Sequence, residues 1–306
     1  MVPLSFGLQD PRRVGIGSAL ASTCLGLCYL AAAGAPARYL VVNAAAFLLG
    51  LFALRAVGGA VSHNRRFASA TMLLCGHSLL ATSLFGAAVE GATRWIWVGP
   101  LSVQVSLVLV PFMILAFVRR PDALGAGAIA FAALALALQP DRAMAGVLAV
   151  GLVVLAVMRP GLWSVAALCA AVCAFAASIV RADALPAVPY VDQILFSAFD
   201  VHVMAGAAVV LGSFLLLVPA IVGGYRDPEQ RVVYLSFGAI WIGCVLAAAL
   251  GNYPTPVVGY GGSAILGYLL GLAALPSAGS VPVQARRPSP PNDAGETLLP
   301  RSALAA

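Results

Sequence analysis

The hydrophobic residues of this chain fall into long runs that short polar segments separate. A helix rises about 1.5 Å per residue and must cross roughly 30 Å of hydrocarbon, so apolar windows of about 17–25 residues are typical of membrane-spanning helices. Ten such windows occur, approximately at residues 14–34, 37–58, 68–89, 103–118, 121–138, 143–158, 161–180, 199–222, 231–250 and 259–277. The pattern predicts an all-α, polytopic membrane protein with about ten transmembrane helices.

Composition supports the same class. Hydrophobic residues make up 62% of the chain and charged residues only 9%, with a mean hydropathy of +0.99. A soluble globule of this length needs more polar surface than that. The net charge of +6 does not require a nucleic-acid partner, because most of the cations, all of them arginines, lie in short segments between the apolar windows.

The distribution of arginines predicts the orientation of the chain, since cytoplasmic loops are enriched in them. With the N-terminus inside, four arginines fall outside: Arg38, Arg94, Arg142 and Arg181. Thirteen fall inside: Arg12, Arg13, Arg55, Arg65, Arg66, Arg119, Arg120, Arg159, Arg226, Arg231, Arg286, Arg287 and Arg301. Both termini are therefore predicted to be cytoplasmic. Residues 1–13 form the N-terminal segment, residues 14–277 one membrane domain, and residues 278–306, rich in Pro, Ser and Arg, a disordered tail.

The start of the last apolar window is crowded with helix-breaking residues. Within residues 254–264 the chain carries two prolines and three glycines, namely Pro254, Pro256, Gly259, Gly261 and Gly262. Irregular backbone is tolerated at membrane depth only where it is buried in protein or lines a wet cavity. This segment is therefore predicted to be part of a site.

Three other predicted outer segments carry candidate residues. Residues 90–104 contain Trp95 and the pair Gly99-Pro100, which also suit an aromatic belt followed by a turn. In the turn Gln139-Pro140-Asp141, the aspartate can cap the following helix. Residues 181–193 bring carboxylates together with Arg181.

These segments together resemble the SEDS family (shape, elongation, division and sporulation; the RodA and FtsW type). The run Gly91-Ala92-Thr93-Arg94-Trp95-Ile96, with Gly99-Pro100 and Gln104-Val105-Ser106 after it, is similar to the family's GARRWI, glycine and QPSE. Gln139-Pro140-Asp141 resembles QPDLGT, and residues 254–263 resemble PLPFISYGGS. A weaker match places Tyr190-Val191-Asp192 on HTD, so that Asp192 falls on the family's catalytic aspartate.

The resemblance implies a ten-span peptidoglycan glycosyltransferase that polymerises lipid II beside a class B penicillin-binding protein in the bacterial inner membrane. It implies Asp192 as the catalytic residue. It also implies substrate-binding residues in the matched motifs, to which the outer arginines are added. The whole set is Arg94, Trp95, Gln104, Ser106, Arg181, Tyr260, Gly261, Gly262 and Ser263. The residues with structural roles in the motifs are Gly99, Pro100, Pro140, Asp141, Pro254 and Pro256.

The chain also departs from the family pattern. Val105 and Leu107 replace the proline and glutamate of QPSE, and Arg142 stands where QPDLGT has leucine. Tyr190-Val191 replaces the HT before the aspartate. The large outer loop that precedes this aspartate in the family is reduced to little more than residues 181–190.

The chemistry of glycosyl transfer gives the candidate residues their roles. Asp192 would take the proton from the acceptor sugar hydroxyl, with its pKa raised by an apolar setting. Arg94 or Arg181 would bind the diphosphate, because a guanidinium matches two phosphate oxygens at once. A divalent cation, Mg²⁺ or Mn²⁺, is the alternative cofactor, although no metal site is evident in the sequence. The alternative for Asp192 is a structural carboxylate that pairs with Arg181 or caps a helix.

Three hypotheses follow from these observations. The first is an active lipid II polymerase in cell division or elongation. The second is a non-catalytic relative that binds a class B penicillin-binding protein or a lipid-linked precursor, which the short loop and the replaced motif residues favour. The third is a lipid flippase or transporter that uses the broken last helix, although such proteins usually carry an internal repeat that this chain lacks.

Overall fold

The structure is a computed structural model, and it describes residues 10–63, 65–181 and 185–276, with the side chains of residues 59–67 left out of the description. The predicted disordered tail, residues 278–306, lies outside the described residues. The helices are α1 (Pro11–Ala32), α2 (Ala37–His63), α3 (Arg65–Phe85), α4 (Val105–Arg119), α5 (Ala123–Leu138), α6 (Arg142–Met158), α7 (Leu162–Ile179), α8 (Ile194–Val201), α9 (Val203–Leu215), α10 (Val218–Arg226), α11 (Arg231–Leu250) and α12 (Gly262–Ala273), with a short 3₁₀ helix at Pro228–Gln230.

The chain is a predominantly helical, multi-pass membrane protein. In the described residues, six helical segments are long and apolar enough to cross a membrane, with four shorter apolar helices beside them: α4, α5, α6 and α12. Apolar side chains face outward on the long helices, as Leu48 and Phe52 of α2 do with exposed fractions of 67% and 71%. The all-α class is thus confirmed, while the count of ten spans stays a prediction.

A small antiparallel sheet interrupts the helices between α3 and α4. Its strands are β1 (Ala87–Val89), β2 (Ala92–Val98) and β3 (Leu101–Gln104), in the order β1-β2-β3. Two-residue turns join them, Glu90-Gly91 with φ values of 47° and 81°, and Gly99-Pro100 with Gly99 at φ 59°. Such turns need left-handed residues, which explains the glycines. The sequence analysis missed this sheet: it extended the third helix over the apolar strand β1 to residue 89 and interpreted residues 90–104 as an outer segment with an aromatic belt and a turn.

The predicted window at 199–222 is also divided in the structure. The break between α8 and α9 lies at His202, whose backbone is extended with φ −171° and whose Nδ1 accepts the Met204 N–H at 3.1 Å. A second break precedes α10, whose first turn contains Pro219. A proline lacks the N–H that would continue a helix, so it fits best in a first turn.

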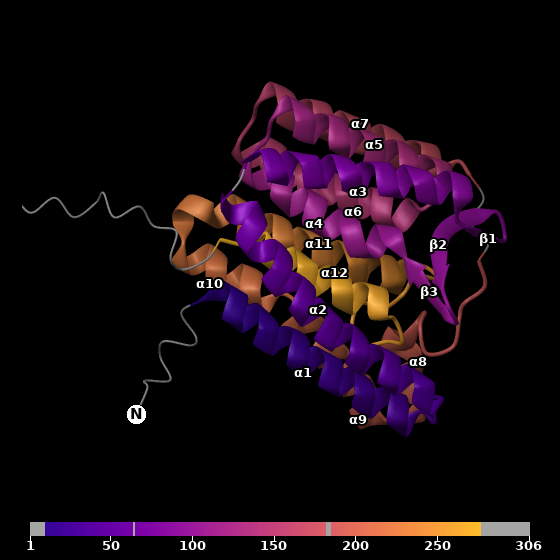
Figure 1. Cartoon of the computed structure of the whole chain (residues 1–306). Helices are drawn as coiled ribbons and strands as arrows, with labels where there is room; N and C mark the ends of the chain where they lie inside the picture. The colour runs from indigo at the N-terminus through magenta and orange to yellow at the C-terminus, as the bar shows by residue number, and fades with distance from the viewer. Residues whose placement is uncertain (1–9, 64, 182–184, 277–306) are drawn as a thin grey trace, which may run out of the picture.

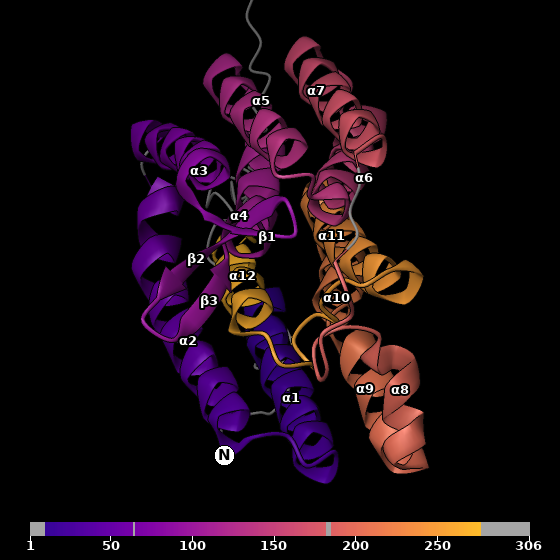
Figure 2. The same cartoon turned by 90° about the vertical axis from the view of Figure 1, so that its right-hand side faces the viewer.

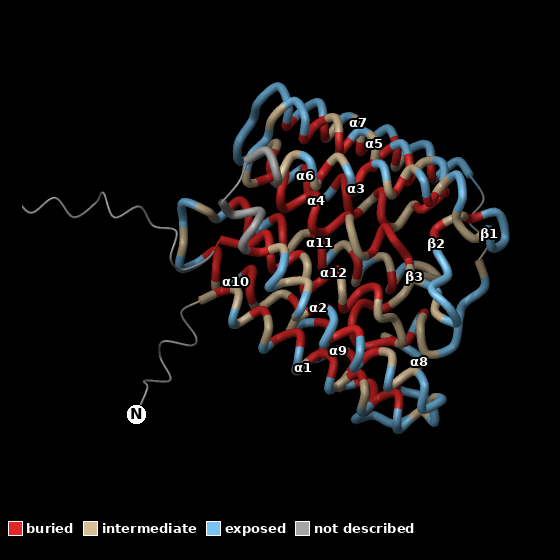
Figure 3. The backbone as a smooth tube through the Cα atoms, in the orientation of Figure 1, coloured by how far each residue is buried: buried red, intermediate tan, exposed pale blue. Residues whose placement is uncertain are grey.

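The core of the molecule is built around α4 and α12. Figure 2 shows both helices in the middle of the bundle, and α12 packs against α1, α2 and α4. The buried residues of Figure 3 run through this centre, while the outer helices alternate between buried and exposed positions. The two central helices are shorter than α1, α2 or α11, because irregular segments at one end of the bundle replace their missing turns.

Both ends of the described chain lie at the same end of the bundle. Figure 1 shows the start of α1 on the left, near the end of α12, whereas the sheet and α8 lie on the right. We call the right-hand end the sheet end; it also includes the α5–α6 turn and residues 185–193 and 251–261.

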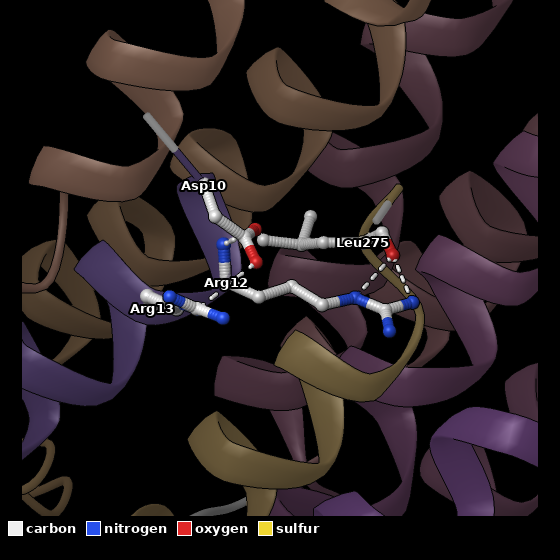
Figure 4. A network of polar contacts seen from close by, with 4 residues as sticks. All are labelled: Asp10, Arg12, Arg13 and Leu275. Atoms are coloured by element: carbon white, nitrogen blue, oxygen red, sulfur yellow. Dashed lines mark hydrogen bonds and ion pairs between the residues drawn. The ribbon is translucent and has the colours of Figure 1, made fainter. Parts of the chain in front are cut away.

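Arg12 ties the two ends of the described chain together. Its Nε donates to the Leu275 carbonyl at 2.7 Å and its Nη2 to the Ala273 carbonyl at 2.9 Å, and Nη2 also contacts Leu275 (Figure 4). Arg119 adds a hydrogen bond to the Ala274 carbonyl at 3.2 Å. The last carbonyls of a helix have no partner within it and carry partial negative charge, so two guanidinium groups there stabilise α12.

Gly267 allows α12 to approach α4 closely. A Cβ at this position would lie 2.1 Å from the backbone oxygen of Leu107, a contact that no side-chain rotation can relieve. We expect Gly267→Ala to destabilise the protein by at least the roughly 1–3 kcal/mol typical of overpacking. The melting temperature in detergent measures this effect. Gly127→Ala, where an added Cβ meets nothing within 4 Å, is the matched control and should not lower the melting temperature, because alanine is the better helix former.

Candidate active site

Asp192 lies in a short segment that pairs with the irregular chain before α12. Asp192 and Pro254 form an antiparallel bridge. The Thr255 N–H donates to the Val191 carbonyl at 3.0 Å, and the Tyr260 N–H donates to the Tyr190 carbonyl at 2.7 Å. The sequence resemblance assigned these two segments to one site, and the structure brings them into direct contact.

The Asp192 carboxyl is buried, with 9% of the residue exposed. Its Oδ2 accepts the backbone N–H of Val188 at 2.8 Å. Burial raises the pKa of Asp192, and the hydrogen bond from Val188 opposes this shift only in part. No ion pair joins Asp192 to an arginine within the described part of the chain. The carboxyl is therefore a better proton acceptor than an exposed aspartate.

Left-handed backbone is concentrated around Asp192. Tyr190 has φ 65° and Gln193 has φ 56°, and the partner segment contains Val257 at φ 68°. A left-handed conformation costs a non-glycine residue on the order of 1–3 kcal/mol, most of all a β-branched one such as valine. Such residues persist where the surrounding contacts fix them, and they are frequent at functional sites.

Asn43 of α2 holds the same irregular segment from its other side. Its Nδ2 donates to the Gly259 carbonyl at 2.9 Å, and its Oδ1 accepts the Gly261 N–H at 3.2 Å. One turn earlier, the ring of Tyr39 stacks on Tyr260 with a centroid distance of 3.7 Å. Asn43 is fully buried. The sequence analysis did not predict a role for Asn43 or Tyr39. A lone amide inside the apolar window 37–58 was a usable signal for Asn43.

A buried polar network connects the other motifs to the start of α12. Ser263 Oγ accepts the Gln104 N–H at 3.0 Å, and the Gln104 amide donates to Asp141 Oδ2 at 3.2 Å. Ser106 Oγ donates to the same oxygen at 2.7 Å. Asp141 also caps α6 by accepting the Met144 N–H at 3.2 Å, as predicted. The matched motif residues are thus brought together in the fold.

A cavity of about 540 Å³ opens beside this network, and we call it the first cavity. Its walls come from α2, from β2 and β3, and from the start of α12, with Val191 and Pro254 at the Asp192 bridge. The predicted site residues that line it are Trp95, Gln104, Pro254, Tyr260, Gly261, Gly262 and Ser263. The lining is mostly apolar, and outer residues such as Leu49, 57% exposed, open it toward the side of the bundle.

Arg94 and Arg181 contact backbone rather than line the first cavity. Arg94 is 2% exposed, and its guanidinium bonds to the carbonyls of Gln139 and Pro140, near the rings of Trp95 and Tyr253. Arg181 Nη1 donates to the Ala137 and Leu138 carbonyls at 2.9 and 3.1 Å. These contacts fasten the sheet and residue 181 to the end of α5. A direct substrate contact of either arginine stays a prediction.

The described residues near Asp192 offer little for a resident metal ion. No group of three histidine, cysteine, aspartate or glutamate side chains suited to a metal occurs among them. Mg²⁺ is often bound by one or two carboxylates together with substrate phosphates. Asp192 would therefore need substrate oxygens to complete the coordination of such an ion.

The solved structures with similar architecture include the rod shape determining protein RodA of Thermus thermophilus. The TM-score is 0.59 at 21% sequence identity, over 85% of this chain and 93% of that one. The chain has the same fold as this RodA. An aspartate-to-alanine mutant of the same RodA gives a TM-score of 0.60, and a chain from a peptidoglycan synthase complex that coordinates polymerization and crosslinking gives 0.57, each over 89% of this chain and 96% of the other.

Sequence comparison finds a similar protein over a shorter stretch. A probable peptidoglycan glycosyltransferase FtsW of Shewanella sediminis is 29% identical over 110 residues. The match spans 33% of this chain and 27% of that FtsW. No family model matches the chain.

Proposed function

We propose that this protein is a peptidoglycan polymerase that joins lipid II disaccharides into glycan strands. The observation that carries the proposal is the buried Asp192 carboxyl, fixed at the bridge to Pro254 beside an apolar cavity. A lipid-linked sugar needs an apolar cavity for its tail and a base for its hydroxyl. The similarity to FtsW and the SEDS fold support the same reaction class.

The reaction requires one base and one leaving group. The Asp192 carboxylate takes the proton of the acceptor sugar hydroxyl while that oxygen bonds to the anomeric carbon of the donor sugar. The bond between this carbon and the phosphate oxygen breaks, and a polyprenyl diphosphate leaves with the electron pair. A cation at the diphosphate, either an arginine or a divalent ion bound largely by substrate oxygens, stabilises the leaving charge.

The proposed topology has ten spans in the bacterial inner membrane, with both termini in the cytoplasm. The arginine distribution supports it, since Arg12 and Arg119 lie together at the end of the bundle opposite the sheet. The sheet end, with Asp192 and the first cavity, then faces the outer leaflet. A class B penicillin-binding protein is the proposed partner, in keeping with the synthase complex whose chain shares the fold.

A non-catalytic scaffold is the second candidate function. The replaced QPSE residues and the short connection between α7 and α8 favour it, because parts that would bind substrate in the family are missing. On this alternative, the protein would still bind the partner or a lipid-linked precursor. Polymer formation decides between the two.

The test is a polymerisation assay with purified full-length protein, purified lipid II and the class B penicillin-binding protein of the same bacterium. We expect glycan strands on a gel only when both proteins are present, with the partner alone as control. Binding of lipid II without strands would support the scaffold. Movement of labelled lipid II across proteoliposomes without strands would instead support the flippase.

A further inference from the structure

The first cavity has a positively charged side chain at its outer end. Helix α2 contributes five of the lining residues, namely Val41, Val42, Ala45, Ala46 and Leu49. Their spacing of three and four residues places them on one face of the helix. Arg38 precedes Val41 by three residues and Val42 by four, so it continues this face by one turn toward the sheet end. A hydrocarbon chain that lies along this face therefore ends beside Arg38.

The rings of three tyrosines connect Arg38 to the candidate active site. Its guanidinium carbon lies 5.3 Å from the ring centroid of Tyr39. Tyr39 stacks on Tyr260, which lines the first cavity, and it packs in T-shaped geometry against Tyr190 with ring centroids 6.1 Å apart. Tyr190 is two residues from Asp192. The aromatic cluster thus connects Arg38 both to the cavity and to the segment that carries the proposed base.

The Arg38 charge has no carboxylate partner in the part of the chain that the structure describes. The side chain is exposed, and the ion pair found in that part joins Arg13 to Asp10 at the other end of the bundle. Arg94 and Arg181 instead donate to backbone carbonyls. Arg38 also lies in the first turn of α2, where the positive end of the helix dipole disfavours a cation. Neither a salt bridge nor the helix dipole therefore accounts for an arginine at this position.

We infer that Arg38 binds the phosphate of a polyprenyl diphosphate whose hydrocarbon chain lies along α2 in the first cavity. A guanidinium binds two phosphate oxygens at once, and the apolar face of α2 accommodates the chain. The exposed residues Val41 and Leu49 open the cavity toward the side of the bundle, so a lipid can enter from the membrane. The choice of lipid class rests on the proposed function, in which Arg38 supplies the cation at the leaving diphosphate.

The test is equilibrium binding of a polyprenyl diphosphate, and of the uncharged polyprenol of the same length, to the purified full-length protein. We expect Arg38→Gln to weaken binding of the diphosphate by about tenfold and to leave binding of the polyprenol unchanged, because only the phosphate contact is lost. Arg38→Lys should retain part of the affinity because the charge is kept. The matched control is Arg120→Gln, which removes an exposed arginine at the opposite end of the bundle and should bind both lipids as the wild type does. Equal loss in both glutamine variants, or none in Arg38→Gln, would overturn the inference.

Two further measurements locate the hydrocarbon chain and identify the lipid class. Ala45→Phe adds bulk to the α2 wall of the first cavity and should weaken binding of both lipids, since both carry the same chain. Unchanged binding in this variant would contradict the placement along α2. Complete competition by phosphatidylglycerol at matched concentration would show a general anionic-lipid site and contradict the isoprenoid assignment. Arg38-dependent binding without any polymerisation would leave this inference standing and reject the proposed function alone.

Discussion

Replacing Asp192 with asparagine is expected to lower the polymerisation rate by about two to four orders of magnitude, the range that a positioned general base contributes. The amide keeps an oxygen that can accept the Val188 N–H, so the local backbone is retained, but it cannot take a proton. Strand formation on a gel and the melting temperature are measured together.

The melting temperature of Asp192→Asn should not fall at neutral pH. Because burial raises the pKa of Asp192, folding favours its protonated form. The stability that comes from protonation is present below the unfolded pKa and is lost as the pH rises through the folded pKa. At neutral pH, the ionised carboxylate therefore costs stability that a neutral amide does not.

The control for this variant is Asp200→Asn, because Asp200 is an exposed carboxylate on the neighbouring helix α8. It should polymerise at the wild-type rate. In the wild type and in this control, activity should fall on acidification at a pH above the ordinary aspartate range, since only ionised Asp192 accepts the proton. Full activity of Asp192→Asn would reject the role of this residue.

Replacing Asn43 with alanine should both destabilise the fold and suppress polymerisation. The change leaves the buried Gly259 carbonyl and the half-buried Gly261 N–H without their partner, and a buried orphaned group costs about 1–3 kcal/mol. It also releases the segment that carries Tyr260 at the wall of the first cavity. Misplacement of a site by about 1 Å can cost on the order of 10²-fold in rate. Thermal unfolding and the polymerisation assay measure the two effects.

A matched control for Asn43 is Thr82→Val, which also removes a buried polar group from a predicted span. The Thr82 hydroxyl donates to the Ser78 carbonyl one turn back in its own helix, at 2.8 Å, so it holds no second segment. We expect a small loss of stability and normal activity. If the two variants behaved alike, Asn43 would be an ordinary buried polar residue rather than a positioning residue.

The helices were the most predictable part of the fold. The window 231–250 coincides with α11, and the window 121–138 differs from α5 by two residues at its start. A continuous apolar run directly reflects burial in lipid and protein. The sheet was missed because β1 was included in the third apolar window and residues 90–104 were interpreted as an outer segment with an aromatic belt. Two glycine-containing turns, at Glu90-Gly91 and Gly99-Pro100, were the available signal.

The site was predictable only in part. The family resemblance assigned Asp192, Gln104 and residues 254–263 to one place, but no spacing rule predicts that Asp192 pairs with a residue 62 positions later. Arg94 or Arg181 was predicted to bind the substrate diphosphate. In the structure Arg94 and Arg181 contact backbone carbonyls, and sequence alone does not distinguish a carbonyl from a phosphate.

Hydrogen bonds at both ends of α12 determine which parts of the molecule can move. Arg12 and Arg119 hold its last carbonyls, while Asn43 and Gln104 hold the chain just before it and its first turn. A helix fixed in this way cannot slide or tilt without breaking several hydrogen bonds at once. On the proposed function, we therefore expect entry and exit of long-chain substrates to displace peripheral helices around a stationary central helix.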